Sequence, residues 1–180
     1  MNRPEEPIRL RATDPVAGEF YPTFSVQIST KAAARIAQAS VRQVKYWDAT
    51  GVVPAFHSPK KFGVGRRWSV NNLIQLRVVS MMREVDAPMD ACRAASQYIG
   101  EMLDQFRLEH IPACKIIVRQ GDPPEVFTAT MDENILPILD PPNRSAPACY
   151  IVGIADAIKE VAANFECEYQ SMIQGRTKLE

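Results

Sequence analysis

The segment Ile28–Val53, ISTKAAARIAQASVRQVKYWDATGVV, decides the fold of this chain because it predicts two short helices joined by a tight turn. Ser29 and Thr30 supply hydroxyl groups that can cap a helix N-terminus, and the following KAAARIA consists mainly of strong helix formers. Ser40 is placed to cap the second helix, VRQVKYWDA. The sequence therefore predicts two capped helices around which the rest of the chain is arranged.

The second of these helices has two chemically different faces. Val41, Val44 and Trp47 are spaced to bury one side of it. The opposite side carries side chains of the types that reach phosphates and base edges in DNA complexes: Arg42, Gln43, Lys45 and Tyr46. A short helix that exposes such side chains fits the major groove of a duplex.

These residues resemble a known family. SVRQVKYWDATGVV, followed by GRRWSVNNLIQLRVVSMMREV, is similar to the DNA-binding domain of MerR-type transcriptional regulators, in which a helix-turn-helix precedes a wing that closes on an arginine pair. The resemblance runs from about Ile28 to about Tyr98. The matching positions are Ser40, Val41, Arg42, Tyr46, Asp48, Gly51, Arg66, Arg67, Ser69, Leu73, Leu76 and Arg77.

Three positions depart from the family pattern. Gln38 replaces the usual glycine of the turn, Trp68 replaces the tyrosine after the arginine pair, and Asp86 replaces the glycine before the next helix. The first of these changes bears on the shape of the turn, and therefore on the angle of the second helix.

The resemblance implies a set of DNA contacts. Arg42, Gln43 and Lys45 would approach the major groove. The expected phosphate contacts are Tyr46, the wing bases Lys60, Lys61, Arg66 and Arg67, and Thr30. Phosphate contacts set affinity and register without reading the base sequence. A two-fold dimer would then recognise an inverted repeat.

The distribution of charge supports a nucleic-acid partner, although the net charge of the whole chain is zero. Residues 31–80 contain nine bases and one acid, Asp48, so this window carries +8 and the other 130 residues sum to −8. A run of charge is often only a solvated surface. Nine bases without interleaved acids are, however, the electrostatic pattern of a DNA-binding head on an acidic body.

The composition sets the expected location. The chain has 180 residues, 46% of them hydrophobic, with neither a long apolar run nor a charged-then-apolar signal sequence at its N-terminus. We therefore expect a cytoplasmic, nucleoid-associated protein without a membrane partner. The four cysteines lack the short paired spacing of a disulfide framework or a zinc site.

The motifs of common enzymes are absent from the sequence. It contains no Gly-rich phosphate loop, no G-x-S-x-G and no HExxH, so we expect no enzyme and no catalytic residue. The alternative to a plain DNA-binding protein is a thiolate metal sensor that joins Cys114, Cys149 and Cys167 with His110. Buried packing is the commoner role for such cysteines, so we expect neither a metal nor a cofactor.

Downstream of the wing, Ser69 is placed to cap a helix over 70–85, with Leu73, Leu76, Met82 and Val85 on its core-facing stripe. A second helix is expected from Pro88 to about Phe106. The pattern then changes to a β-hairpin over 114–120 and 125–130, a short helix over 131–139, a strand over 149–153 and a helix over 154–165.

The predicted fold class is α+β: a mainly helical, MerR-like winged helix-turn-helix domain followed by a small α/β module of order β-β-α-β-α. The expected organisation is a flexible leader (1–24), the DNA-binding domain (25–87), a connecting and dimerisation helix (88–112), the C-terminal module (113–170) and a polar tail (171–180).

The expected function is that of a bacterial, sequence-specific, homodimeric transcriptional regulator of the MerR type, with double-stranded DNA as its partner. RNA polymerase or another protein is an expected further partner of the C-terminal module. Two alternatives stay open. The protein could be an architectural or recombination-accessory protein that bends DNA, or an adaptor that recruits a protein partner through its C-terminal module.

Overall fold

The α+β class predicted from the sequence is confirmed. A computed structural model describes residues 28–56, 65–105, 114–130, 135, 139 and 148–177, without the side chains of 171–177. Among these residues are five helices and two small antiparallel sheets. Their bounds are β1 (Ile28–Ser29), α1 (Thr30–Ile36), α2 (Val41–Ala49), β2 (Arg67–Trp68), α3 (Val70–Glu84), α4 (Met89–Gln105), β3 (Cys114–Arg119), β4 (Glu125–Thr130), β5 (Cys149–Gly153) and α6 (Ile154–Thr177).

Three serine caps begin α1, α2 and α3; the sequence predicts Ser40 and Ser69, and for α1 it offers both Ser29 and Thr30. The Ser29 hydroxyl accepts from the backbone N–H of Ala32, and Ser40 and Ser69 each open a reciprocal capping box. Such a box satisfies two backbone donors that would otherwise lack partners at a helix N-terminus. Local hydrogen bonding therefore fixes where these helices start, independently of their packing.

The same three helices end alike, each with a left-handed residue just beyond the C-cap. These residues are Gln38 (φ 54°), Gly51 (φ 69°) and Asp86 (φ 56°). After each of them, the second N–H beyond the C-cap donates back to a carbonyl three positions before the cap: Ala39 to Ala34, Val52 to Trp47 and Ala87 to Met82. Gln38 and Asp86 thus adopt a left-handed backbone conformation that glycine favours. The steric cost is roughly 1–2 kcal/mol for each residue.

The expected β-hairpin is confirmed. β3 pairs antiparallel with β4, so that Ile117 lies opposite Phe127, and β5 pairs with the other edge of β3. The strand order is β4-β3-β5. The helix expected over 131–139 lies mostly outside the described residues.

The second sheet joins the residues just before α1 to the residues just before α3. β1 pairs with β2 in the register Ile28–Trp68 and Ser29–Arg67. β2 therefore pairs with the residues that immediately precede α1. Residues 57–64, which include Lys60 and Lys61, lie outside the described residues.

α3 lies at the centre of the molecule and contacts α1, α4 and α6. Eleven of its residues are buried, which is far more than one stripe. Val85 was predicted to belong to that stripe, and this is wrong: it is 63% exposed, because the helix ends at Glu84 and the chain turns away. One hydrophobic cluster joins the buried side chains of α1–α4 with those of the three-stranded sheet and α6.

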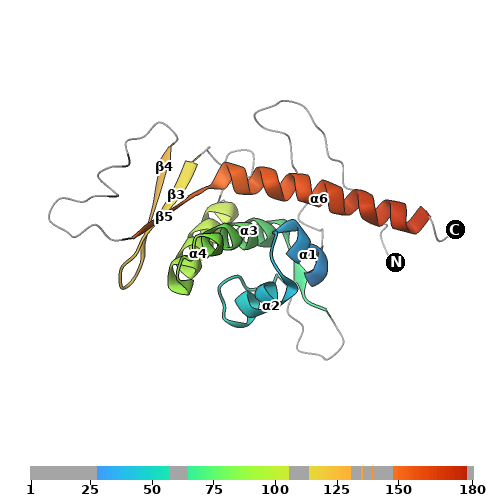
Figure 1. Ribbon diagram of the computed structural model, residues 1–180, viewed down its shortest axis with the longest axis horizontal. Helices are drawn as coiled ribbons and strands as arrows, with labels where there is room; N and C mark the ends of the chain where they lie inside the picture. Colours follow the sequence, from blue (N-terminus) through green and yellow to red (C-terminus); the bar gives the residue numbers. More distant parts are fainter. Residues whose placement is uncertain are drawn as a thin grey trace.

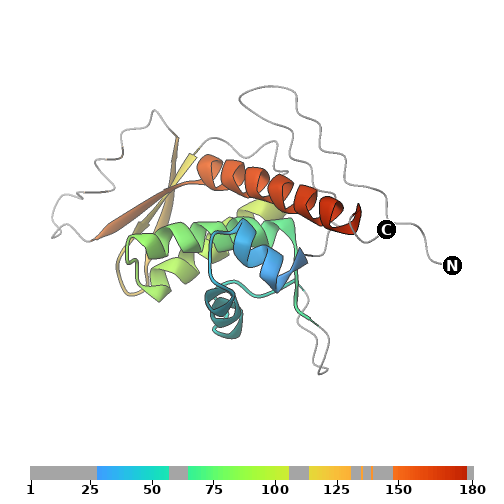
Figure 2. The ribbon, with the colours of Figure 1, turned by 45° about the vertical axis from the view of Figure 1, so that its right-hand side comes forward.

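The last helix is longer than predicted. α6 runs from Ile154 to Thr177, whereas the sequence pattern ended it near Phe165 and predicted a polar tail from Ser171. It lies along α1 and α3 in both views, while α2 lies on the opposite side of the molecule and the three-stranded sheet at one end (Figures 1 and 2). Contacts with α1 support the half of α6 that is nearer its C-terminus. The amphipathic periodicity of the sequence does not reveal these contacts.

Candidate nucleic-acid interface

α2 is oriented by its apolar face. Val44 is fully buried and Trp47 is 2% exposed, so the opposite face points to solvent. Arg42, Gln43, Lys45 and Tyr46 are all exposed there. The structure thus brings together, on one helix face, all four of the residues that the sequence singled out on this element.

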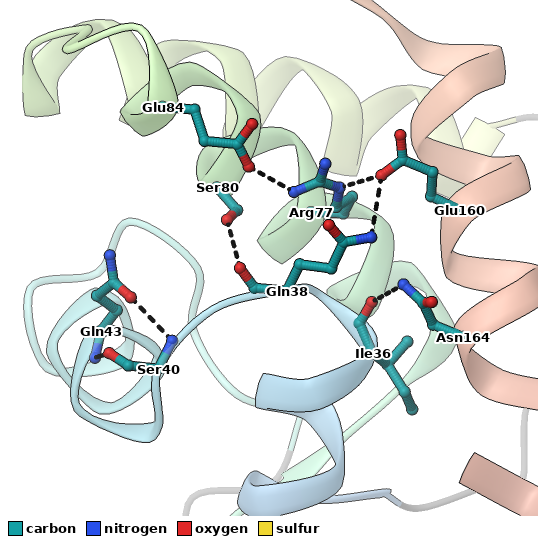
Figure 3. Close-up of polar contacts among 9 residues, drawn as sticks. All are labelled: Ile36, Gln38, Ser40, Gln43, Arg77, Ser80, Glu84, Glu160 and Asn164. Carbon is teal, nitrogen blue, oxygen red and sulfur yellow. Dashed lines mark hydrogen bonds and ion pairs between the residues drawn. The ribbon is translucent and has the colours of Figure 1, made fainter. Parts of the chain in front are cut away.

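Gln43 has a structural role that the sequence reading did not assign to it. Its Oε1 accepts from the Ser40 N–H at 2.8 Å, and its own backbone N–H donates to Ser40 Oγ at 3.1 Å (Figure 3). The carbonyl end of the amide is therefore engaged, which leaves its NH₂ group as the remaining donor of the side chain. The signal that could have found this role is the S-x-x-Q pattern of a capping box.

Thr30 and Trp68 join the two short strands to the first helix. Trp68 is fully buried, and its Nε1–H donates to Thr30 Oγ1 at 3.2 Å. Trp68 thus supplies a fixed donor at this position. The Thr30 hydroxyl hydrogen is left to donate elsewhere, because a hydroxyl both donates and accepts.

The two arginines that end the wing differ in their surroundings. Arg66 forms an ion pair with Asp48 of α2, in which its Nε faces Oδ2 without the direction of a hydrogen bond. Arg67 is exposed on β2, opposite Ser29. Arg66 therefore connects the wing to α2, whereas Arg67 presents its charge to solvent.

Several of the nine bases in the window 31–80 form ion pairs with carboxylates of the same chain. Arg35 donates to Glu168 of α6, with its Nε 2.7 Å from Oε2, and the buried Arg77 lies between Glu84 at 2.8 Å and Glu160 at 2.5 Å (Figure 3). Within the described ranges, the bases of this window with no carboxylate partner are Lys31, Arg42, Lys45 and Arg67. The accessible positive charge is therefore concentrated on α1, α2 and β2.

The pair between α1 and α6 shifts the titration of both partners. The hydrogen bond to Glu168 raises the pKa of Arg35 above its usual value, and the same bond lowers the pKa of Glu168. Both groups are thus charged over a wider pH range than they would be alone. Asn164 of α6 adds a hydrogen bond of 3.0 Å to the Ile36 carbonyl at the end of α1 (Figure 3).

The C-terminal end of α2 is held from α4. Arg93 Nη2 donates to the carbonyl oxygen of Thr50, the C-cap of α2, at 3.2 Å. A cation at this end complements the negative end of the helix dipole. This residue was not singled out from the sequence, because the spacing of 43 residues leaves no local signal.

The cysteines do not form the metal site that the sequence left open. Cys114 lies at the start of β3, while Cys149 pairs with Arg119 at the other end of that strand. Five residues of strand separate these ends by roughly 17 Å, so the two thiols cannot share one ion. Among the described residues no group of three metal-ligating side chains occurs, and His110 lies outside them.

Burial also makes the inner thiols poor nucleophiles. It raises the pKa of Cys92 to about 11 and that of Cys114 above its usual value. A thiol that stays protonated at neutral pH neither attacks substrates nor binds metals readily. Cys92 lies on α4 and packs in the hydrophobic core.

Comparison of the chain with protein-family models and with curated proteins found no match. Among the described residues, no helix combines the length and the apolar character needed to cross a membrane.

Proposed function

We propose that this protein binds double-stranded DNA with the exposed face of α2 in the major groove. Within that class, we propose that it is a bacterial transcriptional regulator of the MerR type, which acts in the cytoplasm as a dimer on an inverted repeat. The observation that carries the proposal is the combination of a buried Trp47 with exposed Arg42 and Lys45, which precede it by five and two residues on the same short helix.

The roles of the individual residues follow from their surroundings. Arg42 and Lys45 lie one helical turn apart and have no acidic partner among the described residues, so both are available for DNA. Gln43 would contribute its NH₂ group as a donor. Tyr46, 53% exposed, and Arg67 on β2 would contact phosphates.

The remaining proposed contacts are supporting ones. Arg66 would act mainly through its ion pair with Asp48, which ties the wing to α2, and Thr30 would donate its hydroxyl hydrogen to a phosphate. We propose that Lys60 and Lys61 add phosphate contacts, on the sequence pattern alone. The proposed function needs no cofactor and no catalytic group.

The experiment is a binding measurement on duplexes selected from a random pool with the full-length protein. Arg42→Ala should weaken binding to the selected duplex and reduce its preference over unrelated DNA, with a loss of about 1–3 kcal/mol for a base contact. Lys159→Ala, an exposed lysine on α6 and therefore on the side opposite α2, is the matched control and should bind as the wild type does.

Arg67→Ala should behave differently from Arg42→Ala. A lost phosphate contact weakens binding to all duplexes to a similar extent and lowers the slope of log K against log salt by about 1. A palindrome in the selected pool would support the dimer, and its half-site spacing would report the geometry. If the protein ignores duplex DNA even at low salt, or if Arg42→Ala and Lys159→Ala bind equally, the proposal is wrong.

A further inference from the structure

Phe56 is the most exposed large apolar side chain of the described residues, at 65%. It follows α2 closely, in the loop that leads into the wing. A single exposed apolar residue is ordinary on a protein surface and by itself implies nothing. The backbone that carries this ring is, however, held in an unusually complete way.

Three consecutive residues of the loop are fixed by side chains from two helices. Ala55 N–H donates to Asp48 Oδ1 of α2 at 2.9 Å. Phe56 N–H donates to Asn72 Oδ1 of α3 at 3.1 Å, and the Pro54 carbonyl accepts from Asn72 Nδ2 at 3.2 Å. The loop is therefore clamped directly at the residue that exposes its ring.

The clamp is itself part of a buried polar chain. Asn72 is 9% exposed and belongs to the capping box of Ser69. Its Nδ2 also donates to Gln75 Oε1 at 3.1 Å, and Gln75 Nε2 donates to the Ser96 carbonyl of α4 at 2.9 Å. A buried network in which the members satisfy one another holds a single conformation, so the backbone position of Phe56 is set before any partner binds.

The surroundings of the ring indicate what it would meet. Asp48, which holds Ala55 with one oxygen, forms its ion pair with Arg66 through the other, so the loop lies between α2 and the end of the wing. The exposed charges on these two elements are the cations Arg42, Lys45 and Arg67. An exposed apolar ring on a loop that is attached to two elements with exposed cations suits a nucleic acid, in which phosphates border apolar base faces.

We propose that Phe56 is an apolar wedge that enters a base step beside the α2 contact and kinks the duplex. This inference rests on the proposed function. An inserted side chain partly unstacks one step, and the cost is repaid by the added contact of the bent duplex with the protein. Pyrimidine–purine steps unstack most easily, so the wedge would give sequence preference at a position without hydrogen bonds to bases.

The test compares Phe56→Ala and Phe56→Leu with the wild type, on a selected duplex carrying a fluorescent donor and acceptor at its two ends. Phe56→Ala should lower affinity about 5- to 150-fold, the range of one lost stacking contact, and should also reduce the bend. Phe56→Leu, which keeps an apolar wedge, should retain most of both. Because the ring is exposed, all variants should unfold at the wild-type temperature.

Val85→Ala is the matched control, since Val85 is 63% exposed but lies at the end of α3. It should change neither affinity nor bend. If the wild type binds the duplex and Phe56→Ala bends it equally, the wedge is wrong while the proposed function stands. A loss of affinity with an unchanged bend also overturns the wedge. If the wild type binds no duplex, the proposed function fails first.

Discussion

At the scale of single residues, Gln43 combines two duties that are normally separate. Its carbonyl oxygen completes the capping box at the start of α2, and its position on the exposed face directs its NH₂ group outward. Removing the side chain would therefore change both the helix and any DNA contact. The two duties can be separated by chemistry, because glutamate caps as well as glutamine does.

Gln43→Glu should leave the free energy of unfolding unchanged or slightly higher, since a carboxylate at a helix N-terminus is favourable. It should nevertheless weaken DNA binding, because an acceptor with a negative charge replaces a donor. Gln43→Ala should lower the free energy of unfolding by about 0.5–2 kcal/mol through loss of the cap. Chemical denaturation and duplex titration measure the two effects.

Gln97→Glu adds the same charge change at an exposed site on α4 and should alter neither quantity appreciably. Wild-type DNA affinity in Gln43→Glu would contradict the position of Gln43 at the interface. Unchanged stability in Gln43→Ala would contradict its role as a cap.

At the scale of elements, α6 acts as a brace on the first helix and the turn after it. Glu168 accepts from Arg35. Asn164 donates to the Ile36 carbonyl, and Glu160 accepts from Gln38 Nε2 at 3.4 Å (Figure 3). These contacts meet the turn whose left-handed residue is Gln38. The helix at the C-terminal end of the described chain thus helps to set the direction in which α2 leaves the turn.

Glu168→Gln should make the stability of the fold less dependent on pH in the acidic range. The folded-state pKa of Glu168 lies below its usual value of 4.5, so the pair stabilises the protein above that pH and loses its effect as the pH falls through the lower folded value. Because Arg35 is largely exposed, we expect only about 0.2–1 kcal/mol near neutral pH.

Thermal unfolding at pH 7, 5 and 3 measures this contribution, with Glu101→Gln on the exposed face of α4 as the control. The difference between wild type and Glu168→Gln should be largest at pH 7 and should shrink toward pH 3. A difference that grows as the pH falls would contradict the sign of the effect.

At the scale of the whole molecule, the helical head (β1, α1, α2, β2 and α3) and the three-stranded sheet share one core. Trp47 and Trp68 of the head belong to the same hydrophobic cluster as Ile116 of β3 and Val161 of α6. The head and the C-terminal elements therefore do not bury their apolar surfaces separately. Loss of α6 would uncover parts of α1 and α3.

We expect a single cooperative unfolding transition. Tryptophan fluorescence reports the head, since both tryptophans lie there, and far-UV circular dichroism reports all helices. Val161→Ala, a truncation in the buried face of α6, should lower the free energy of unfolding by about 1–3 kcal/mol. It should shift both signals by the same amount. A tryptophan transition that stays in place would contradict the shared core.

Ala163→Ser, at an exposed site of α6, should leave both transitions unchanged and controls for the sequence change itself. Two separate transitions in the wild type would indicate that the head and the C-terminal module fold independently, as the domain division expected from the sequence allows.

Several local features were predictable from the sequence. The three serine caps, the bounds of α2 and the pairing of β3 with β4 all follow from patterns within a few residues. The exposed face of α2 was equally predictable from the sequence, because the spacing of Val44 and Trp47 fixes which side is buried. Contacts across long separations were not predictable: Arg93 with Thr50, Asn72 with Phe56 and Glu168 with Arg35 carry no signal in their neighbourhoods.

By itself, the sequence determined the starts of α1, α2 and α3 and the residues that face outward on α2, because capping and amphipathic spacing are local. Only the tertiary structure decided which basic side chains have a carboxylate partner. It pairs Arg35, Arg66 and Arg77 with carboxylates 7 to 133 residues away, and it leaves Arg42 and Lys45 without such partners among the described residues. Charge counts sum over a segment, whereas neutralisation depends on distances that exist only after the chain has folded.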